Sequence, residues 1–366
     1  MIPYVEIKDK YTLNTIALVE PQECWFELSF QNVGEFEVYC RASQANLTAL
    51  QKGRYVKIPN KRFIWVITSI QYTHTAGGAR MISAKGYEAK WLLHKRCILT
   101  PKELQGTITN AVYGLVSENM GEALPDSSPR KIKGFTVDTN NALVYVGGTQ
   151  APRGNLLEFV NNLLKTYNFG SQVVFENGKL KFTIFSGEVK TNTVRFSQSL
   201  DNLLTSEYLT DDAGIATNAL VVSTFDETIT VNGEEEKHKV DYVKEVDTGK
   251  TGVDRAEVVV ESNLSTKYED GNGVEQETTP DSALYQGWQQ QEGYNKLSEQ
   301  TAIEEVSGEL DISNSRYVFD KDFFIGDMVR MQEEYFNFYA NIRISKYTMK
   351  QDANGYGEEA EYGGRE

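Results

Sequence analysis

Side chains that do chemistry in enzymes and metal sites are few in this sequence, and their spacing is unsuited to it. His74, His94 and His238 have no second histidine or carboxylate at a metal-ligand spacing. His94 lies three residues before Cys97, but a catalytic Cys–His pair needs a third group that orients the base, and this short segment offers none. We interpret the pair as a surface imidazole next to a half-buried thiol.

Carboxylates are too common here to mark an active site, because the chain of 366 residues carries 52 of them. A glycosidase would need two carboxylates that converge in one cleft, which a sequence cannot show. Neither a G-x-S-x-G nucleophile motif nor a phosphate-binding loop is present. The sequence therefore predicts no catalytic, cofactor-binding or metal-ligating residue, no cofactor and no enzymatic activity.

Aromatic side chains offer a different chemistry, the stacking surface of a carbohydrate-binding protein. Trp65 and Trp91 lie in strongly patterned segments, where we expect core or interface positions. Tyr285 and Trp288 share one face of an expected helix, and core packing is again the favoured interpretation. A carbohydrate-binding protein stays open as an alternative.

The net charge of −15 is concentrated in one block. Residues 226–310 hold 21 acidic and 7 basic side chains, whereas the rest of the chain holds 31 acidic and 30 basic ones. Phosphate contacts need clustered Lys and Arg, so the chain is not a general nucleic-acid binder. We interpret the block either as a solvated insertion or as a surface that repels DNA.

The sequence also bears on compartment. No run of eighteen apolar residues occurs, so no membrane insertion is predicted for this chain. The N-terminus contains lysines but lacks the apolar segment of a secretory signal. Synthesis in the cytoplasm follows as an expectation.

The elements that would have to position any site fall into several domains, because 366 residues exceed one ordinary core. Residues 1–99 are expected to form a first β-barrel module. Apolar residues alternate on both sides of Asn32 and Gly34, which predicts a hairpin with one buried face. Cys24 and Cys40 lie in its two arms and could be neighbours, but in a reducing cytoplasm we expect free, half-buried thiols.

The remainder of this first module reads as a short helix followed by a curled antiparallel sheet. Such a sheet is typical of a small barrel or sandwich. The helix is expected over residues 44–51, and the strands over residues 55–58, 63–72 and 80–87.

Residues 100–187 are expected to form a small α+β module. A first helix is predicted to begin with Pro101 in its first turn. A second helix is predicted to open at Asn155 and to present a broad apolar face. Asn177 and Gly178 lie between two alternating runs and predict a hairpin, because both central residues of a type I′ turn need positive φ.

Residues 188–366 are expected to form a second β-barrel module that carries an acidic insertion and a helix at about 226–300. Asn232 and Gly233 predict a second hairpin, whose charged tip we interpret as an exposed β-arm. A helix is predicted to follow from about 279 to 299. The predicted fold class is thus mainly β (α+β), with structural turns at Gly34, Gly86, Asn177, Gly178, Gly326 and Asp327.

An ordered series of these motifs resembles the tail-hub proteins of phages and prophages of Gram-positive bacteria, also called tail-associated or baseplate-hub proteins. The N-terminal part of the series is Val33-Gly34-Glu35-Phe36, the short helix, the strand at 67–72, and the exit from Gly86-Tyr87-Glu88 to Arg96. The C-terminal part is a helix, the turn from Asp322 through Gly326-Asp327 to Val329, and the strand at Arg343-Ile344. The resemblance covers both ends and is weakest over 226–278.

The resemblance implies two tail-tube-like β-barrel modules bridged by the small α+β module, and a structural role. It implies a homotrimer that closes the distal end of the tail tube, with a distal tail protein ring, a tape-measure protein and receptor-binding or fibre proteins as partners. Three copies of two similar barrels would present six similar elements to a six-fold tube. DNA would cross the lumen without specific binding, in a virion tail tip assembled in the cytoplasm of the bacterial host. The alternative is a cell-wall-degrading or carbohydrate-binding tail protein.

Overall fold

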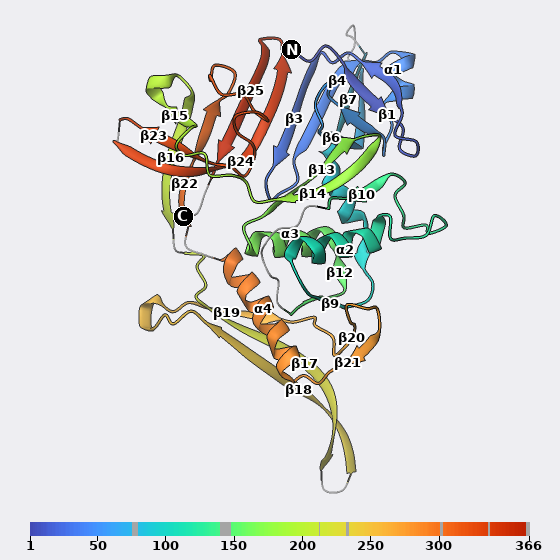
Figure 1. Cartoon of the computed structure of the whole chain (residues 1–366), viewed down its shortest axis with the longest axis vertical. Helices are drawn as coiled ribbons and strands as arrows, with labels where there is room; N and C mark the ends of the chain where they lie inside the picture. Colours follow the sequence, from blue (N-terminus) through green and yellow to red (C-terminus); the bar gives the residue numbers. More distant parts are fainter. Residues whose placement is uncertain are drawn as a thin grey trace.

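The computed structural model describes residues 1–74, 80–139, 148–211, 213–231, 234–300, 303–335 and 337–363. Strands make up most of the regular structure, so the predicted mainly β class is confirmed. Figure 1 shows a large sheet built from blue and red segments, a helical layer beneath it and a long two-stranded arm at the far end.

The large sheet has thirteen strands and combines both ends of the chain. Hydrogen-bonded neighbours follow the order β16-β22-β25-β24-β3-β4-β7-β6-β5-β1-β2, and β23 joins β15 to β24. The N-terminal strands are β1 (Val5–Lys8), β2 (Thr15–Val19), β3 (Glu23–Ser29), β4 (Glu35–Arg41), β5 (Tyr55–Lys57), β6 (Ile64–His74) and β7 (Arg80–Glu88). The C-terminal strands are β15 (Arg195–Ser197), β16 (Leu203–Asp211), β22 (Ile303–Asp311), β23 (Met328–Glu333), β24 (Phe338–Asp352) and β25 (Gly355–Tyr362).

Antiparallel pairing of β3 with β24 joins the two halves of this sheet, in a register that sets Ser29 opposite Lys346. One hydrophobic core runs beneath both halves. Phe26 from the first half and Val329 and Ile344 from the second are all buried in it. Removal of this apolar surface from water is the main force that holds the halves together.

Pairing among the described strands follows an open path, and no closed barrel is found in that part of the chain. The two expected barrel modules therefore stay a prediction. The expected N-terminal hairpin is present as β3 and β4, whose side chains alternate between buried and exposed positions. The short helix is also present, as α1 (Gln44–Ala49).

The two cysteines of this hairpin are free, as expected, but they are buried rather than half-buried. Cys24 lies opposite Val38 in the ladder, so Cys40 is not its direct neighbour. Cys97 is free and exposed, so the expectation of a half-buried thiol next to His94 is wrong.

The α+β layer packs α2 (Ile108–Met120) and α3 (Leu156–Thr166) against a three-stranded sheet of β10 (Phe135–Val137), β14 (Lys179–Phe185) and β13 (Gly170–Glu176). Its own core also takes in side chains from the N-terminal segment, such as Ile64 and Leu92. Asn155 caps α3 as predicted, because its Oδ1 accepts hydrogen bonds from the backbone N–H groups of Leu157 and Glu158.

The prediction that the first helix of this layer begins at Pro101 is wrong. The chain forms β9 (Lys102–Leu104) there, which pairs with β11 (Thr149–Ala151). Gly106 has a φ of +87°, a left-handed conformation that interrupts a helix. The helix therefore begins after Thr107, whose hydroxyl accepts from the backbone N–H of Asn110.

Short elements complete this layer and its borders. They are η1 (Ala89–Lys95), β8 (Cys97–Ile98), β12 (Gly154–Asn155), η2 (Gln198–Leu200), η3 (Gly252–Asp254), β20 (Lys267–Glu269) and β21 (Glu275–Glu277). β20 and β21 extend the sheet of β9 and β11, so the acidic insertion is tied to the α+β layer.

The larger elements of the acidic insertion are β17 (Asn218–Val231), β18 (Glu234–Asp247), β19 (Glu257–Glu261) and α4 (Ala283–Glu299). β17 and β18 pair along their whole length and form the projecting arm in Figure 1, although the turn residues Asn232 and Gly233 lie outside the described residues. α4 packs across the base of the arm, with Ser282 as its N-cap. None of the described helices is both long enough and apolar enough to cross a membrane.

The structure places the six expected turn residues at different kinds of position. Asn177 and Gly178 have φ values of 50° and 75° and connect β13 to β14, as a type I′ turn requires. Gly34 leads into β4, where a Cβ would lie 2.3 Å from the Glu27 carbonyl oxygen. Gly86 lies inside β7 instead of a turn, where a Cβ would lie 1.9 Å from the Val66 carbonyl oxygen. A close strand crossing, not a turn, therefore requires this glycine.

Gly326 and Asp327 do form a turn, directly before β23. Gly326 has a φ of +87°. The carboxylate of Asp327 accepts hydrogen bonds from the backbone N–H groups of Phe324 and Glu188. The Lys190 ammonium lies 3.3 Å from the same carboxylate. This turn therefore anchors the segment that enters the second half of the sheet.

Candidate functional site

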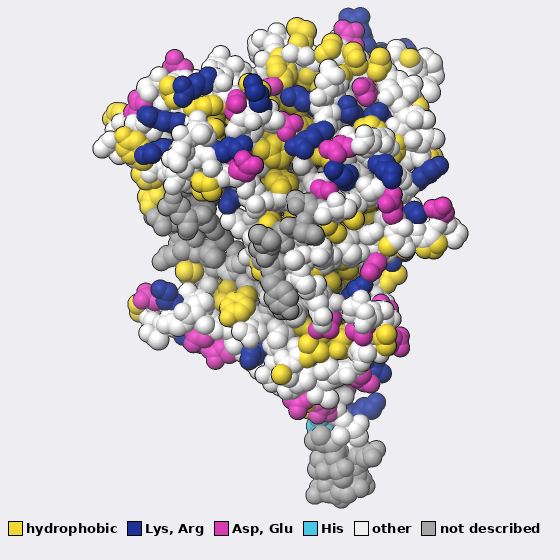
Figure 2. Space-filling model, viewed as in Figure 1, with side chains coloured by type: hydrophobic (Ala, Val, Ile, Leu, Met, Phe, Trp, Pro, Cys, Tyr) yellow, Lys and Arg dark blue, Asp and Glu magenta, His cyan; other side chains and the backbone are white. Residues whose placement is uncertain are grey.

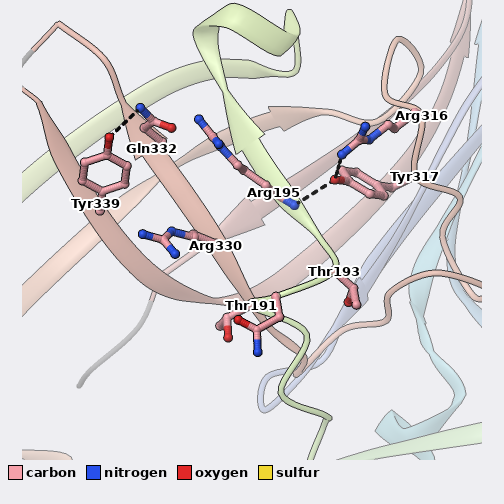
Figure 3. Close-up of a pocket in the computed structure, with 9 residues that line it drawn as sticks. Thr191, Thr193, Arg195, Arg316, Tyr317, Arg330, Gln332 and Tyr339 are labelled. Atoms are coloured by element: carbon pink, nitrogen blue, oxygen red, sulfur yellow. Dashed lines mark hydrogen bonds between the residues drawn. The ribbon is translucent and has the colours of Figure 1, made fainter.

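A cavity of about 420 Å³ opens beside β15 and β23, at the C-terminal half of the large sheet. Figure 3 shows its lining, which comes from three segments of the chain that are distant in sequence. The lining residues are Thr191, Asn192, Thr193, Arg195, Arg316, Tyr317, Arg330, Gln332 and Tyr339. We call this cavity the arginine pocket.

Strand pairing places two of the arginines side by side. β15 and β23 run parallel, and Arg195 is the direct partner of Arg330 in their register. Both side chains are exposed, whereas the next residues, Phe196 and Met331, point into the core. Like charges that face each other across a ladder repel, so this arrangement favours binding of an anion.

Two tyrosines hold the arginines in place. The Tyr317 hydroxyl accepts a hydrogen bond from Arg316 Nη2 at 2.6 Å and another from the backbone N–H of Arg195 at 3.2 Å (Figure 3). The guanidinium of Arg330 lies over the ring of Tyr339, 5.2 Å from its centroid. Gln332 Nε2 donates to the Tyr339 hydroxyl at 3.0 Å. Stacking and hydrogen bonding limit the freedom of the Arg316 and Arg330 side chains before any ligand arrives.

No carboxylate among the described residues pairs with Arg195, Arg316 or Arg330. Other arginines of the chain do find such partners: Arg62 lies 2.8 Å from Asp320, and Arg255 pairs with three acidic side chains. A guanidinium binds carboxylate and phosphate groups through paired N–H donors. The pocket can therefore hold an anionic group, and its described lining contains no Asp, Glu, His or Cys that could serve as a base or nucleophile.

The sequence offered little to reveal this pocket. None of the six predicted turn residues lines it, although Gly326 and Asp327 lie just before β23. An arginine at an outward position of a strand is a common surface feature. The signal lies in the pairing of strands separated by more than a hundred residues, which no local pattern contains. Among the described residues, no group of His, Cys, Asp and Glu side chains is arranged to hold a metal ion.

The family of the chain is decided by a match along nearly its whole length. The family model of Siphovirus ReqiPepy6 Gp37-like proteins matches residues 6–363. The chain belongs to this family. No curated protein is similar enough in sequence to count as a relative.

Solved structures similar to this member of the Gp37-like family include two phage tail proteins. The tail protein from Neisseria meningitidis MC58 is 11% identical with a TM-score of 0.56, and the alignment covers 99% of this chain and 96% of that one. The 43 kDa tail protein of prophage MuSo2 from Shewanella oneidensis is 12% identical with a TM-score of 0.54, and 98% of each chain is covered. The fold is thus shared with these proteins from end to end. The resemblance to phage tail proteins drawn from the sequence is confirmed.

Proposed function

We propose that this Gp37-like protein is a structural, non-enzymatic component of a phage or prophage tail tip. In this proposal it is a homotrimeric hub that closes the distal end of the tail tube and contacts the distal tail ring, the tape-measure protein and the receptor-binding or fibre proteins. The observation that carries the proposal is the extent of the likeness: the family match and the fold of phage tail proteins both span the whole chain rather than one module.

Both ends of the large sheet support a closed assembly. Among the described residues, β2 pairs only with β1 and β16 pairs only with β22, so each presents an open edge. Apolar side chains are exposed along these edges, including Ile16 and Leu18 on β2 and Leu204 on β16. Open apolar edges invite pairing with another chain. Because the two edges differ, their contact would be head-to-tail, which is the geometry that closes a ring.

The charge distribution supports passage of DNA without retention. In Figure 2, dark blue side chains gather over the large sheet, while magenta ones are prominent over the lower part of the molecule. Grip on DNA depends on an excess of clustered cations, and the chain outside residues 226–310 is close to neutral, with 31 acidic and 30 basic side chains. A neighbouring tail component with exposed carboxylates is, in contrast, well suited to the arginine pocket.

Light scattering coupled to size-exclusion chromatography tests the trimer directly. At micromolar concentration we expect a particle of three chains of 41.3 kDa, and averaged electron micrographs with a three-fold ring and a central hole. Leu18→Lys or Leu204→Lys should each reduce the trimer, whereas Val253→Lys, an exposed position in the insertion, should not. A stable monomer at this concentration would overturn the proposal.

Binding experiments compare the affinity of the protein for two polyanions, a polyglutamate peptide and duplex DNA. A fluorescent polyglutamate peptide should bind the purified protein, more weakly at higher salt, and Arg195→Gln with Arg330→Gln should abolish this binding while the trimer persists. Duplex DNA should bind poorly to both proteins. Tight, salt-sensitive binding of DNA to the wild type would overturn the proposed lumen.

A further inference from the structure

A second cavity, of about 380 Å³, lies between α3 and α4, where the acidic insertion meets the α+β layer. Its walls come from β11, α3, the end of β19 and α4. We call it the inter-helix pocket. Its volume falls within the range of about 300–1,000 Å³ that is usual for small-molecule sites.

Three polar atoms in the residues that line this pocket are buried and have no hydrogen-bond partner among the described residues: Thr149 Oγ1, Trp288 Nε1 and Glu292 Oε2. Thr149 is 3% exposed and Trp288 is 1% exposed. A buried polar atom without a partner costs about 1–3 kcal/mol. Three such atoms around one cavity indicate a site that is shaped for a polar ligand rather than for packing alone.

The rest of the lining is rich in side-chain amides. They belong to Gln150, Asn155, Asn162, Asn263, Gln291 and Asn295. An amide both donates and accepts hydrogen bonds, as the hydroxyl groups of a sugar do. Gln150 and Asn155 use both amide atoms within the protein. The amides offered to a ligand are therefore those of Asn162 and Asn263, together with the carbonyl oxygen of Gln291 and the amide nitrogen of Asn295. Phe159 and Trp288 add aromatic surface of the kind that packs against the C–H face of a sugar ring.

The pocket walls are held in place by hydrogen bonds between the segments that form them. Gln150 exchanges two hydrogen bonds with the backbone of Ser265, at 3.0 and 3.1 Å, which fixes β11 to the insertion. Thr166 Oγ1 donates to Asn295 Oδ1 at 2.8 Å, which links α3 to α4. A preformed site of this kind loses little entropy when a ligand binds.

Other ligand classes fit less well. Glu158, Glu292 and Glu299 line the cavity against only Arg153 and Lys296, so an anion would meet net negative charge. A metal ion would need a cluster of acidic or imidazole ligands, and the described residues contain none. A wholly apolar ligand would leave the three polar atoms unpaired. Burial also raises the pKa of Glu292 above its ordinary value.

We propose that the inter-helix pocket binds a saccharide, with one or two uncharged pyranose rings held by the amide side chains and by Thr149 and Trp288. This binding activity is separate from the proposed trimer. The open edges β2 and β16 belong to the large sheet, whereas the pocket is lined by α3 and α4, which lie below that sheet in Figure 1. A sugar on the host surface is the source that would suit a tail protein.

Isothermal titration of the full-length protein with N-acetylglucosamine, chitobiose, glucose, galactose and rhamnose tests the proposal. At least one sugar should bind. Thr149→Val keeps the shape of the side chain and removes its hydroxyl, whereas Trp288→Phe removes the indole N–H together with part of the aromatic ring system; each should weaken binding by at least tenfold. Arg330→Gln, in the arginine pocket, should leave binding unchanged.

Thermal unfolding and light scattering on the same variants keep the outcome interpretable. Each variant should remain folded and should assemble as the wild type does, so a failed trimer and a failed sugar site are separate results. Absence of binding by all five sugars would overturn the proposal. So would equal affinity in the wild type and in Trp288→Phe, or a higher melting temperature of both pocket variants without any sugar binding, which would mark the cavity as purely structural.

Discussion

The ring of Phe30 occupies the space that a side chain on Gly326 would need: a Cβ there would lie 2.5 Å from Phe30 Cε2. The same ring leaves no room for a Cβ on Gly170, which would lie 2.3 Å from Cδ2. The backbone N–H of Phe30 also donates to the Ser345 carbonyl at 2.9 Å. Phe30 therefore marks the point where the N-terminal segment, the α+β layer and the second half of the sheet meet.

Gly326→Ala is expected to destabilise the protein. The added methyl group would collide with Phe30, and the φ of +87° is strained for any residue with a Cβ. Crowding of a packed core and this strain together predict a loss of about 2–4 kcal/mol in the free energy of unfolding. Urea unfolding monitored by circular dichroism measures it.

Gly287→Ala is the matched control for this substitution. Gly287 lies within α4, and no atom lies within 4 Å of a Cβ built there. Alanine should raise helix stability at that position by up to about 1 kcal/mol. Equal unfolding midpoints for Gly326→Ala and the wild type would refute the assigned role of Phe30.

Local signals in the sequence sufficed for local structure. The Asn177–Gly178 turn, the α3 cap at Asn155 and the alternation along β3 and β4 each depend on a few neighbouring residues, and each is found where the pattern predicts it. The predicted start of α2 is wrong because Pro101 is also compatible with an extended segment. The left-handed backbone of Gly106, five residues later, prevents a helix from running through this region.

Non-local pairing escaped prediction for a physical reason. The junction of Ser29 with Lys346 and the pair Arg195–Arg330 form between segments more than a hundred residues apart. Many strands carry suitable alternation, so the pattern does not specify which two will meet. The arginine pocket depends on this pairing, so the sequence does not predict it. The interpretation of Trp288 as a core position on a helix needs only local spacing, and it is confirmed.

Lys90→Met is expected to cost more than an ordinary surface change, because Lys90 and Glu88 form a buried pair. Lys90 is 0% and Glu88 1% exposed, and their charged atoms lie 3.6 Å apart. Lys90 Nζ also donates to the carbonyl oxygens of Ser29 and Ser171. Removal of one partner from a buried pair costs about 3–5 kcal/mol, whereas Lys52→Met, at an exposed position, should change stability by less than about 0.5 kcal/mol.

The pH dependence of the loss in free energy of unfolding caused by Lys90→Met, its stability deficit, gives a second readout. Burial raises the pKa of Glu88 above its ordinary value, and loss of the Lys90 charge would raise that pKa further. A carboxyl group with a raised pKa in the folded state stabilises the fold as it becomes protonated. The deficit of Lys90→Met should thus shrink as the pH falls toward 5; a deficit independent of pH would argue against the ion pair.

Glu333 should affect the free energy of unfolding with the opposite pH dependence to Glu88, because its pKa is lowered rather than raised. Its carboxylate accepts hydrogen bonds from the Ser206 hydroxyl, the backbone N–H of Tyr335 and Gln198, and these lower its pKa below the ordinary value of 4.5. A lowered pKa gives stability that is complete above 4.5 and is lost as the pH falls through the folded-state value. Urea titrations between pH 3 and 6 should show a shallower acid loss in Glu333→Gln than in the wild type.

Glu334→Gln serves as the comparison for this experiment, because Glu334 is the exposed residue that directly follows β23. Its acid profile should follow that of the wild type. Identical profiles for all three proteins would mean that the bonds from Ser206 and Gln198 do not link β23 to the β16 segment.

Thiol reactivity checks the packing of the first hairpin. Burial raises the pKa of Cys24 to about 12 and that of Cys40 to about 11, so neither forms a thiolate near neutral pH. Cys97 is exposed. Titration of the native protein with an aromatic disulfide reagent at pH 8 should therefore show one rapidly reacting thiol, which Cys97→Ser removes. All three should react in urea, since the cysteines are free; a second fast thiol in the native state would mean that the β3–β4 face opens readily and that the shared core is looser than its burial indicates.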